Sequence, residues 1–299
     1  MKKWLLRIFL GLVVIALGIG AFYYKTMRDI GFFRDPVFET ERPTVPALTQ
    51  PAILVFSKTN SFIHKEAIPA AKVELQQLAK KNGWSVYLTD SGAIHNAEDL
   101  AKFKTVIWNN VTGDVLTESQ RTAFQNYIEQ GGGFVALHGA GDGSIGKNWP
   151  WYTDKLIGAE FIGHPMKQQF QVATVHVEDR SDPITDGLDE NWSRTDEWYS
   201  FASSPRSKGF HILATLDENS YSPEGLWGKS VRMGADHPII WKHCVGRGRV
   251  FYSAMGHTAS SYEEPKYQAV LTHAIAWAIG QEGPDCVSMQ LKPEAENKP

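Results

Sequence analysis

Cysteine is nearly absent from this sequence, and its scarcity excludes several kinds of site. Only Cys244 and Cys286 occur in 299 residues, and they form neither a C-x-x-C pair nor another metal-binding spacing. Zinc ribbons and thioredoxin-like redox centres are therefore excluded. Neither cysteine stands at a predicted turn from a strand into a helix, so no catalytic thiol is expected. The two thiols pair in an oxidising compartment and stay separate otherwise, and the sequence leaves both alternatives open.

Strong charge and several common motifs are also missing. The net charge of −3 gives no reason to expect a nucleic-acid partner. No G-x-S-x-G motif occurs, which argues against a serine hydrolase with a nucleophile elbow. The glycines at 131–133 precede an apolar run, whereas phosphate-binding glycines follow a strand and open a helix. No repeat or low-complexity segment is present.

Residues 1–25 are predicted to be a signal anchor that crosses a membrane through residues 4–24. Ile8–Tyr24 carry no charge, and these 17 residues are at the short limit for a membrane span. An uncleaved anchor is favoured over a cleaved export signal because no clean A-x-A site follows. Three basic residues precede the apolar segment and two follow it, and this bias leads us to expect the domain on the periplasmic or other extracytoplasmic side.

The rest of the chain divides into three predicted parts. Residues 26–51 contain four prolines and show no sustained period, which is typical of an extended linker. Residues 52–282 are predicted to form a globular domain, and the polar residues 283–299 a flexible tail.

Strand and helix patterns alternate in the first half of the globular part. Apolar runs at 52–56, 84–88, 105–108 and 134–137 are separated by helical patterns at 65–82, 97–102 and 117–130. This alternation predicts a three-layer, flavodoxin-like α/β fold, with a mostly parallel sheet and helices on both faces. Further on, strands are predicted at 170–177, 210–216, 238–242 and 249–252, and a closing helix at 266–280.

His138 directly follows one of these predicted strands. A glycine cluster ends a helix, an apolar run crosses the sheet, and the run stops at His138 before a turn of small residues. Open α/β sheets build their sites at the carboxyl ends of strands. We therefore expect binding or chemistry around His138.

Several ordered motifs resemble the ThuA-like family, which is named for trehalose utilisation and is a branch of the class I glutamine-amidotransferase-like fold. The motifs are Phe62-Ile63-His64, residues 131–140, residues 158–165, residues 196–199, residues 238–241 continuing to 248–252, and Met255-Gly256-His257. The resemblance implies this fold and a role in the metabolism of disaccharides or 3-keto sugars. It also places His138 where the amidotransferase relatives carry a nucleophilic cysteine, with Ala136 where their elbow has glycine. Because imidazole cannot replace that thiolate, glutaminase activity is not expected.

Histidines and carboxylates on the predicted loops supply the candidate site. The predicted catalytic residues are His138, His164, Glu197 and His257. The predicted substrate-binding residues are His64, Asn109, Trp149, Trp198 and Tyr199. A divalent metal such as Zn, Fe or Mn is possible, with His64, His138, His164 and Glu197 as its predicted ligands, although no H-x-H spacing supports it.

Two functions from different classes fit this pattern. The first is a hydrolase, lyase or isomerase of a small sugar, using His/carboxylate acid–base or metal-assisted chemistry. The alternative is a non-catalytic, membrane-anchored carbohydrate-binding or scaffold domain. The enzyme predicts that the histidines and Glu197 converge within hydrogen-bonding reach, whereas the scaffold predicts histidines buried separately. The other six histidines are expected to be structural: His95, His176, His211, His237, His243 and His273.

Overall fold

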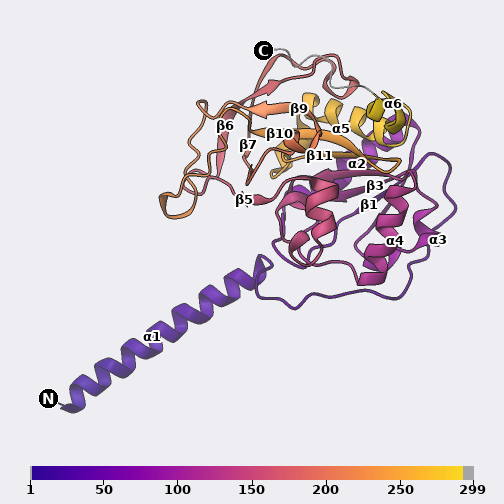
Figure 1. Cartoon of the computed structure of the whole chain (residues 1–299). Coiled ribbons are helices and arrows are strands. Elements are labelled where there is room, and N and C mark those ends of the chain that lie inside the picture. The colour runs from indigo at the N-terminus through magenta and orange to yellow at the C-terminus, as the bar shows by residue number, and fades with distance from the viewer. Residues whose placement is uncertain (1, 292–299) are drawn as a thin grey trace.

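The computed structural model describes residues 2–291, which form one long helix, a connecting segment and an α/β domain. Helix α1 (Lys2–Asp29) leaves the domain as a single rod, and none of its residues is buried (Figure 1). By length and composition this helix can cross a membrane, and a signal sequence near the N-terminus would have the same features.

The segment of residues 30–51 has no helix or strand and is bound to the domain by side chains. Arg42 forms ion pairs with Glu98 and Asp99 of the domain, the latter through its Nε at 2.9 Å. Glu39 accepts a hydrogen bond from the backbone N–H of Gly92 at 2.9 Å. The predicted linker therefore follows the domain surface.

One half of the sheet is parallel, as predicted. Its strands occur in the order β2-β1-β3-β4-β11, and all neighbours in this half are parallel. The bounds are β1 (Ala52–Phe56), β2 (Ser85–Thr89), β3 (Thr105–Asn109), β4 (Gly133–Leu137) and β11 (Gly248–Ser253). Strands β1, β3 and β4 are buried along their whole length, as continuous apolar runs predict.

Helices cover both faces of this half, as predicted. Helices α3 (Ala97–Leu100) and α4 (Glu118–Glu129) contact each other on one side, and α2 (Ala67–Asn82) and α5 (Pro265–Ala278) on the other (Figure 1). The capping box expected from Thr117 is present, because its side chain accepts from Gln120 N and Gln120 returns the bond. Gly83 ends α2 in a left-handed conformation.

The second half of the sheet is antiparallel, which the sequence did not predict. Strands β10 (Pro238–Val245), β9 (His211–Leu216), β6 (Phe170–Val177) and β7 (Asn191–Glu197) continue the sheet beyond β11. Each neighbouring pair there is antiparallel, so β10 and β6 run against the other strands of this nine-stranded sheet. The sheet is thus mixed, with most strands running one way. Strands β5 (Phe161–Gly163) and β8 (Ser200–Phe201) form a separate pair.

The β6–β7 ribbon places residues of the far edge over the middle of the sheet. Strand β6 pairs with β9 only through Val175–Val177, while it pairs with β7 along Phe170–His176. The first half of β6 therefore projects past the end of β9 and carries the end of β7 with it. This projection brings Glu197 to the carboxyl ends of β4 and β11.

The two cysteines form a disulfide, which selects one of the alternatives left open above. Cys286 begins α6 (Cys286–Leu291) and is bonded to Cys244 on β10. The described part of the predicted flexible tail is therefore tied to the sheet. Residues 292–299 of that predicted tail lie outside the described residues.

Candidate active site

His138 stands at a strained turn where β4 ends. Its φ of 40° lies in the left-handed region, which costs energy for a residue with a side chain. The chain turns there directly into a short 3-10 helix. Nδ1 of His138 lies 2.7 Å from the carbonyl of Ala254 and donates to it, so in the neutral ring Nε2 has a free lone pair. The strand end therefore fixes both the position and the tautomer of His138.

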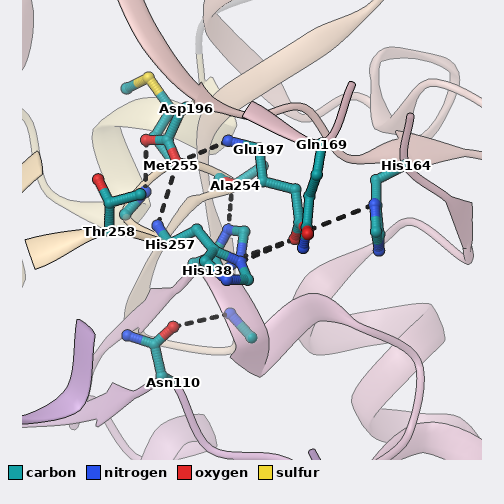
Figure 2. A network of polar contacts seen from close by, with 12 residues as sticks. Asn110, His138, His164, Gln169, Asp196, Glu197, Ala254, Met255, His257 and Thr258 are labelled. Atoms are coloured by element: carbon teal, nitrogen blue, oxygen red, sulfur yellow. Dashed lines mark hydrogen bonds and ion pairs between the residues drawn. The ribbon is translucent and has the colours of Figure 1, made fainter. Parts of the chain in front are cut away.

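His257 follows β11 and is held in place through Asp196. The backbone N–H groups of Gly256 and His257 donate to the Asp196 carboxylate at 2.8 and 3.1 Å. Ser261 and Arg194 contact the same carboxylate. Asp196 thus positions the loop, and Nδ1 of His257 lies 2.9 Å from Nε2 of His138 (Figure 2).

Glu197, the last residue of β7, joins the two imidazoles. Its Oε2 lies 2.9 Å from Nδ1 of His257 and 3.3 Å from Nε2 of His138. Its Oε1 accepts from Gln169 at 2.5 Å and lies 3.3 Å from Nδ1 of His164 (Figure 2). Burial alone would raise the pKa of Glu197, but the neighbouring imidazoles of His138 and His257 outweigh it and hold the pKa well below its usual range. Glu197 is therefore a carboxylate at neutral pH.

His64, in the loop after β1, completes the group. Its ring packs edge-on against the rings of His138 and His257, with centroids 4.9 and 4.7 Å away. Only 3% of His64 is exposed, yet its Nδ1 has no hydrogen-bond partner among the described residues. Burial, and then the neighbouring His138, hold the pKa of His64 well below its ordinary value, so the ring is neutral. A buried and unpaired nitrogen is costly unless a ligand uses it.

These four residues have the composition of a divalent-metal site, and we call them the histidine cluster: His64, His138, Glu197 and His257. Their ligand atoms all lie within 4.8 Å of one another. Neutral imidazoles and one carboxylate form the nitrogen and oxygen set that suits Zn²⁺, Fe²⁺ or Mn²⁺. The residues present therefore fit such an ion.

The structure brings some of the predicted site residues into the histidine cluster and leaves others outside it. His257 was predicted as catalytic, and it stands in the metal-compatible group in place of His164. His164 contacts the opposite oxygen of Glu197 instead, and 21% of its side chain is exposed. Tyr199, predicted to bind substrate, is buried, and its ring packs on His138 with centroids 4.1 Å apart.

The other three predicted substrate-binding residues lie away from the cluster in the buried interior. Asn109 donates to Ser57 Oγ and to the carbonyl of Ile68. Trp149 belongs to an aromatic group with Trp108 and Tyr152. Trp198 is buried and donates its indole N–H to the carbonyl of Gln171. These side chains pack the domain, so the expected tryptophan platform is not formed by them.

Sequence reasoning missed Gln169 and Asn110. Gln169 lies just before β6 and donates to Glu197, and Asn110 accepts the N–H of Gly139 directly after His138 (Figure 2). Neither belongs to a motif. Asn110 follows β3, and its place at a strand end was the one available signal.

A cavity of about 700 Å³ leads to the cluster. Its lining includes His64 and His257, the rings of Phe62 and Phe170, and Ile30 directly after α1. Cavities of this size accept small ligands, and aromatic faces suit a sugar ring.

The comparisons with known proteins agree with this fold. The sequence model of the ThuA family, described as trehalose utilisation, matches residues 52–278. A ThuA-like protein from Bacteroides uniformis is 25% identical, with a TM-score of 0.67 over 79% of this chain and 94% of that chain. A ThuA-like protein from Parabacteroides merdae shares the fold at 18% identity, with a TM-score of 0.56 over 78% of this chain and 91% of that chain. A search of curated proteins gave no match. The chain therefore belongs to the ThuA family, as its motifs predicted.

Proposed function

We propose that this protein is an enzyme that binds a divalent metal ion in the histidine cluster and acts on a disaccharide or a 3-keto-sugar derivative. The observation that carries the proposal is the convergence of three imidazoles and one carboxylate from four separate segments, with ligand atoms within 4.8 Å. Scattered histidines would have favoured the alternative of a non-catalytic scaffold. Convergence at hydrogen-bonding distances supports the enzyme.

Charge supports a cation as the ligand of the cluster. Glu197 contributes one negative charge in a buried place, and the imidazole of His64 is neutral. One carboxylate among imidazoles is a ligand set that a divalent cation can occupy. The unpaired Nδ1 of His64 supports the same ligand, because coordination would satisfy a nitrogen that is otherwise desolvated without a partner.

The residues around the cluster suit proton transfer on a sugar. When bound, a metal ion of this kind polarises a carbonyl or hydroxyl oxygen. His164 is more exposed than His138 and His257, so it can accept or deliver a proton at the substrate, with Glu197 orienting its ring. We expect no glutaminase step, because His138 occupies the strained strand end where the resemblance places the thiolate of amidotransferases.

We also propose that α1 remains as an anchor and that the domain lies outside the cytoplasm. Two observations support this. Helix α1 is long and apolar enough to cross a membrane, and the Cys244–Cys286 disulfide is typical of an oxidising compartment.

Metal analysis of the purified full chain tests the enzyme proposal. After incubation with Zn²⁺ or Mn²⁺ and removal of free ion, the wild type should retain about one ion per chain, and His138→Ala should retain none. His176→Ala is the matched control, because His176 is exposed and contacts Asn191 away from the cluster. Equal retention by wild type and His138→Ala, with both folded by circular dichroism, would contradict the metal site.

Substrate turnover separates the enzyme from a binding domain. Trehalose and its 3-keto derivative are the probes, and product formation is followed by chromatography. The metal-loaded wild type should convert at least one of them, while His138→Ala should convert neither. Binding of a sugar without any conversion would support the scaffold alternative instead.

A further inference from the structure

Large apolar side chains are exposed on one side of the domain, next to the end of α1. Soluble surfaces rarely leave such side chains grouped, and grouped ones mark contact with a partner or a membrane. We call this set the apolar rim, and it consists of Phe32, Phe33, Ile162, Met166, Phe170, Val172, Leu226 and Trp227.

The most exposed member, Trp227, is held out by a strained loop. Glu224 and Ser230 pair as a β-bridge, and Gly225 N donates to Lys229 O at 2.8 Å, so the loop is closed at its base. Trp227 has φ 53° and ψ 32°, a left-handed conformation that is costly for an aromatic residue. Of its surface, 95% is exposed, so no packing within the described residues offsets that cost.

Contacts of three rim residues connect the loop, the cavity and the segment after α1. Met166 N donates to Glu224 O at 2.9 Å, which places Met166 beside the loop. Phe170 lines the cavity together with Ile30, the residue directly after α1. Phe32 contacts Phe62, another residue of the cavity wall, with ring centroids 6.0 Å apart. In Figure 1 the loop projects from the same side of the domain as α1.

We propose that the apolar rim lies on the surface of the bilayer that α1 crosses, with Leu226 and Trp227 in the interfacial layer. This proposal rests on the proposed anchoring by α1. Tryptophan favours the boundary between lipid and water, which suits a ring at an exposed loop tip. Lys229, two residues after Trp227, suits anionic headgroups, while Lys167 and Arg232 form ion pairs with Glu224 and Glu218.

This orientation determines the direction in which the cavity opens. Ile30 forms part of its wall and lies one residue beyond α1, so the entrance near His64 and His257 faces the lipid surface.

Depth-dependent fluorescence quenching of the full chain tests the proposal in vesicles of phosphatidylcholine and phosphatidylglycerol. The native cysteines are joined in a disulfide, so a single introduced cysteine is available for a bimane label. The reporter is Leu226→Cys, which keeps Trp227. Leu17→Cys in α1 reports the anchor, and exposed Ala97→Cys on α3 is the control on the opposite side of the domain (Figure 1).

Lipids with a nitroxide near the headgroup should quench the label at 226, and lipids with a deep nitroxide should quench the label at 17. The label at 97 should keep its emission. Adding Trp227→Ser should reduce the quenching at 226 and leave that at 17 unchanged.

Each contrary outcome has a separate meaning. Quenching at 17 without quenching at 226 would overturn the docking and leave the anchor intact. A label at 226 that is shielded from aqueous iodide but not quenched by lipid would assign the rim to a protein partner or a second copy. Loss of quenching at 17 would overturn both anchor and docking, while metal retention by the histidine cluster would be unaffected.

Discussion

Two buried histidine–glutamate pairs in this domain differ in how fully their polar atoms are used. His237 uses both ring nitrogens, with Nδ1 2.8 Å from Glu218 and Nε2 2.8 Å from the carbonyl of Tyr199. Glu218 also accepts the backbone N–H groups of Met233 and Gly234. By contrast, the cluster around Glu197 includes a buried histidine, His64, with an unpaired Nδ1.

Whether every buried polar atom has a hydrogen-bond partner distinguishes a structural pair from a binding site better than the extent of burial does. Both carboxylates are buried and contact histidine. In the Glu218 pair the polar groups satisfy one another, so the pair stabilises the fold without a ligand. In the Glu197 cluster three imidazoles surround one carboxylate, and Nδ1 of His64 has no hydrogen-bond partner among the described residues. A bound cation would satisfy that nitrogen.

The largest expected effect comes from changing the two carboxylates in the same way. Glu197→Gln removes the charged ligand, so Zn²⁺ affinity should fall on the order of 100-fold or more, as losses at metal-site residues commonly do. Glu218→Gln should leave the affinity unchanged. It should lower the free energy of unfolding by about 1–3 kcal/mol, because buried donors lose a charged acceptor.

Isothermal titration with Zn²⁺ and denaturant unfolding measure the two effects on the same preparations. The comparison fails if Glu218→Gln weakens Zn²⁺ binding as much as Glu197→Gln does.

Much of the fold follows from sequence pattern, and the missing part has a physical cause. The buried strands β1, β3 and β4 are continuous apolar runs, so their prediction was confirmed. Strand β7 was missed because its buried positions include Arg194 and Asp196, which form an ion pair at 2.9 Å. A strand whose inward side is polar shows no hydrophobic alternation.

From the sequence, only the part of the site that directly follows a recognisable strand could be predicted. His138 was found because a histidine directly follows a buried run. The partnership of Glu197 with His138 depends on the projecting β6–β7 ribbon, which brings an edge strand over the middle of the sheet. Sequence gives no information on that projection, so the replacement of His164 by His257 in the metal-compatible group could not be foreseen.

Stability at acid pH should depend on His95, another buried histidine whose two ring nitrogens both form hydrogen bonds. Nδ1 donates to Gly92 O, Nε2 accepts from Trp108 Nε1, and burial lowers the pKa of His95 to about 3. Between pH 6.5 and 3 the unfolded chain binds a proton at this residue and the folded chain does not, so stability falls as pH falls. At pH 5 the loss relative to neutral pH should be about 2 kcal/mol.

Comparison with His95→Phe isolates this contribution from the carboxylates. The variant loses a constant amount of stability because Trp108 loses its acceptor. Its pH dependence between 6.5 and 5 should be shallower than that of the wild type. Parallel pH curves from urea unfolding would show that His95 is not held neutral by its partners.

The smallest expected effect comes from two glycines that separate site geometry from stability. A Cβ on Gly139 would lie 2.7 Å from Cε1 of His64, so Gly139→Ala must displace the ring that carries the unpaired nitrogen. Gly83 has φ 70°, and nothing among the described residues lies within 4 Å of its Cβ position. Gly83→Ala should therefore cost about 1 kcal/mol of stability through backbone strain and leave the histidine cluster unchanged.

Gly139→Ala should instead reduce Zn²⁺ affinity by about tenfold, equivalent to about 1.4 kcal/mol. Unchanged affinity in Gly139→Ala would mean that His64 is not a ligand, and the contrast between the two histidine–glutamate groups would then rest on His138, His257 and Glu197 alone.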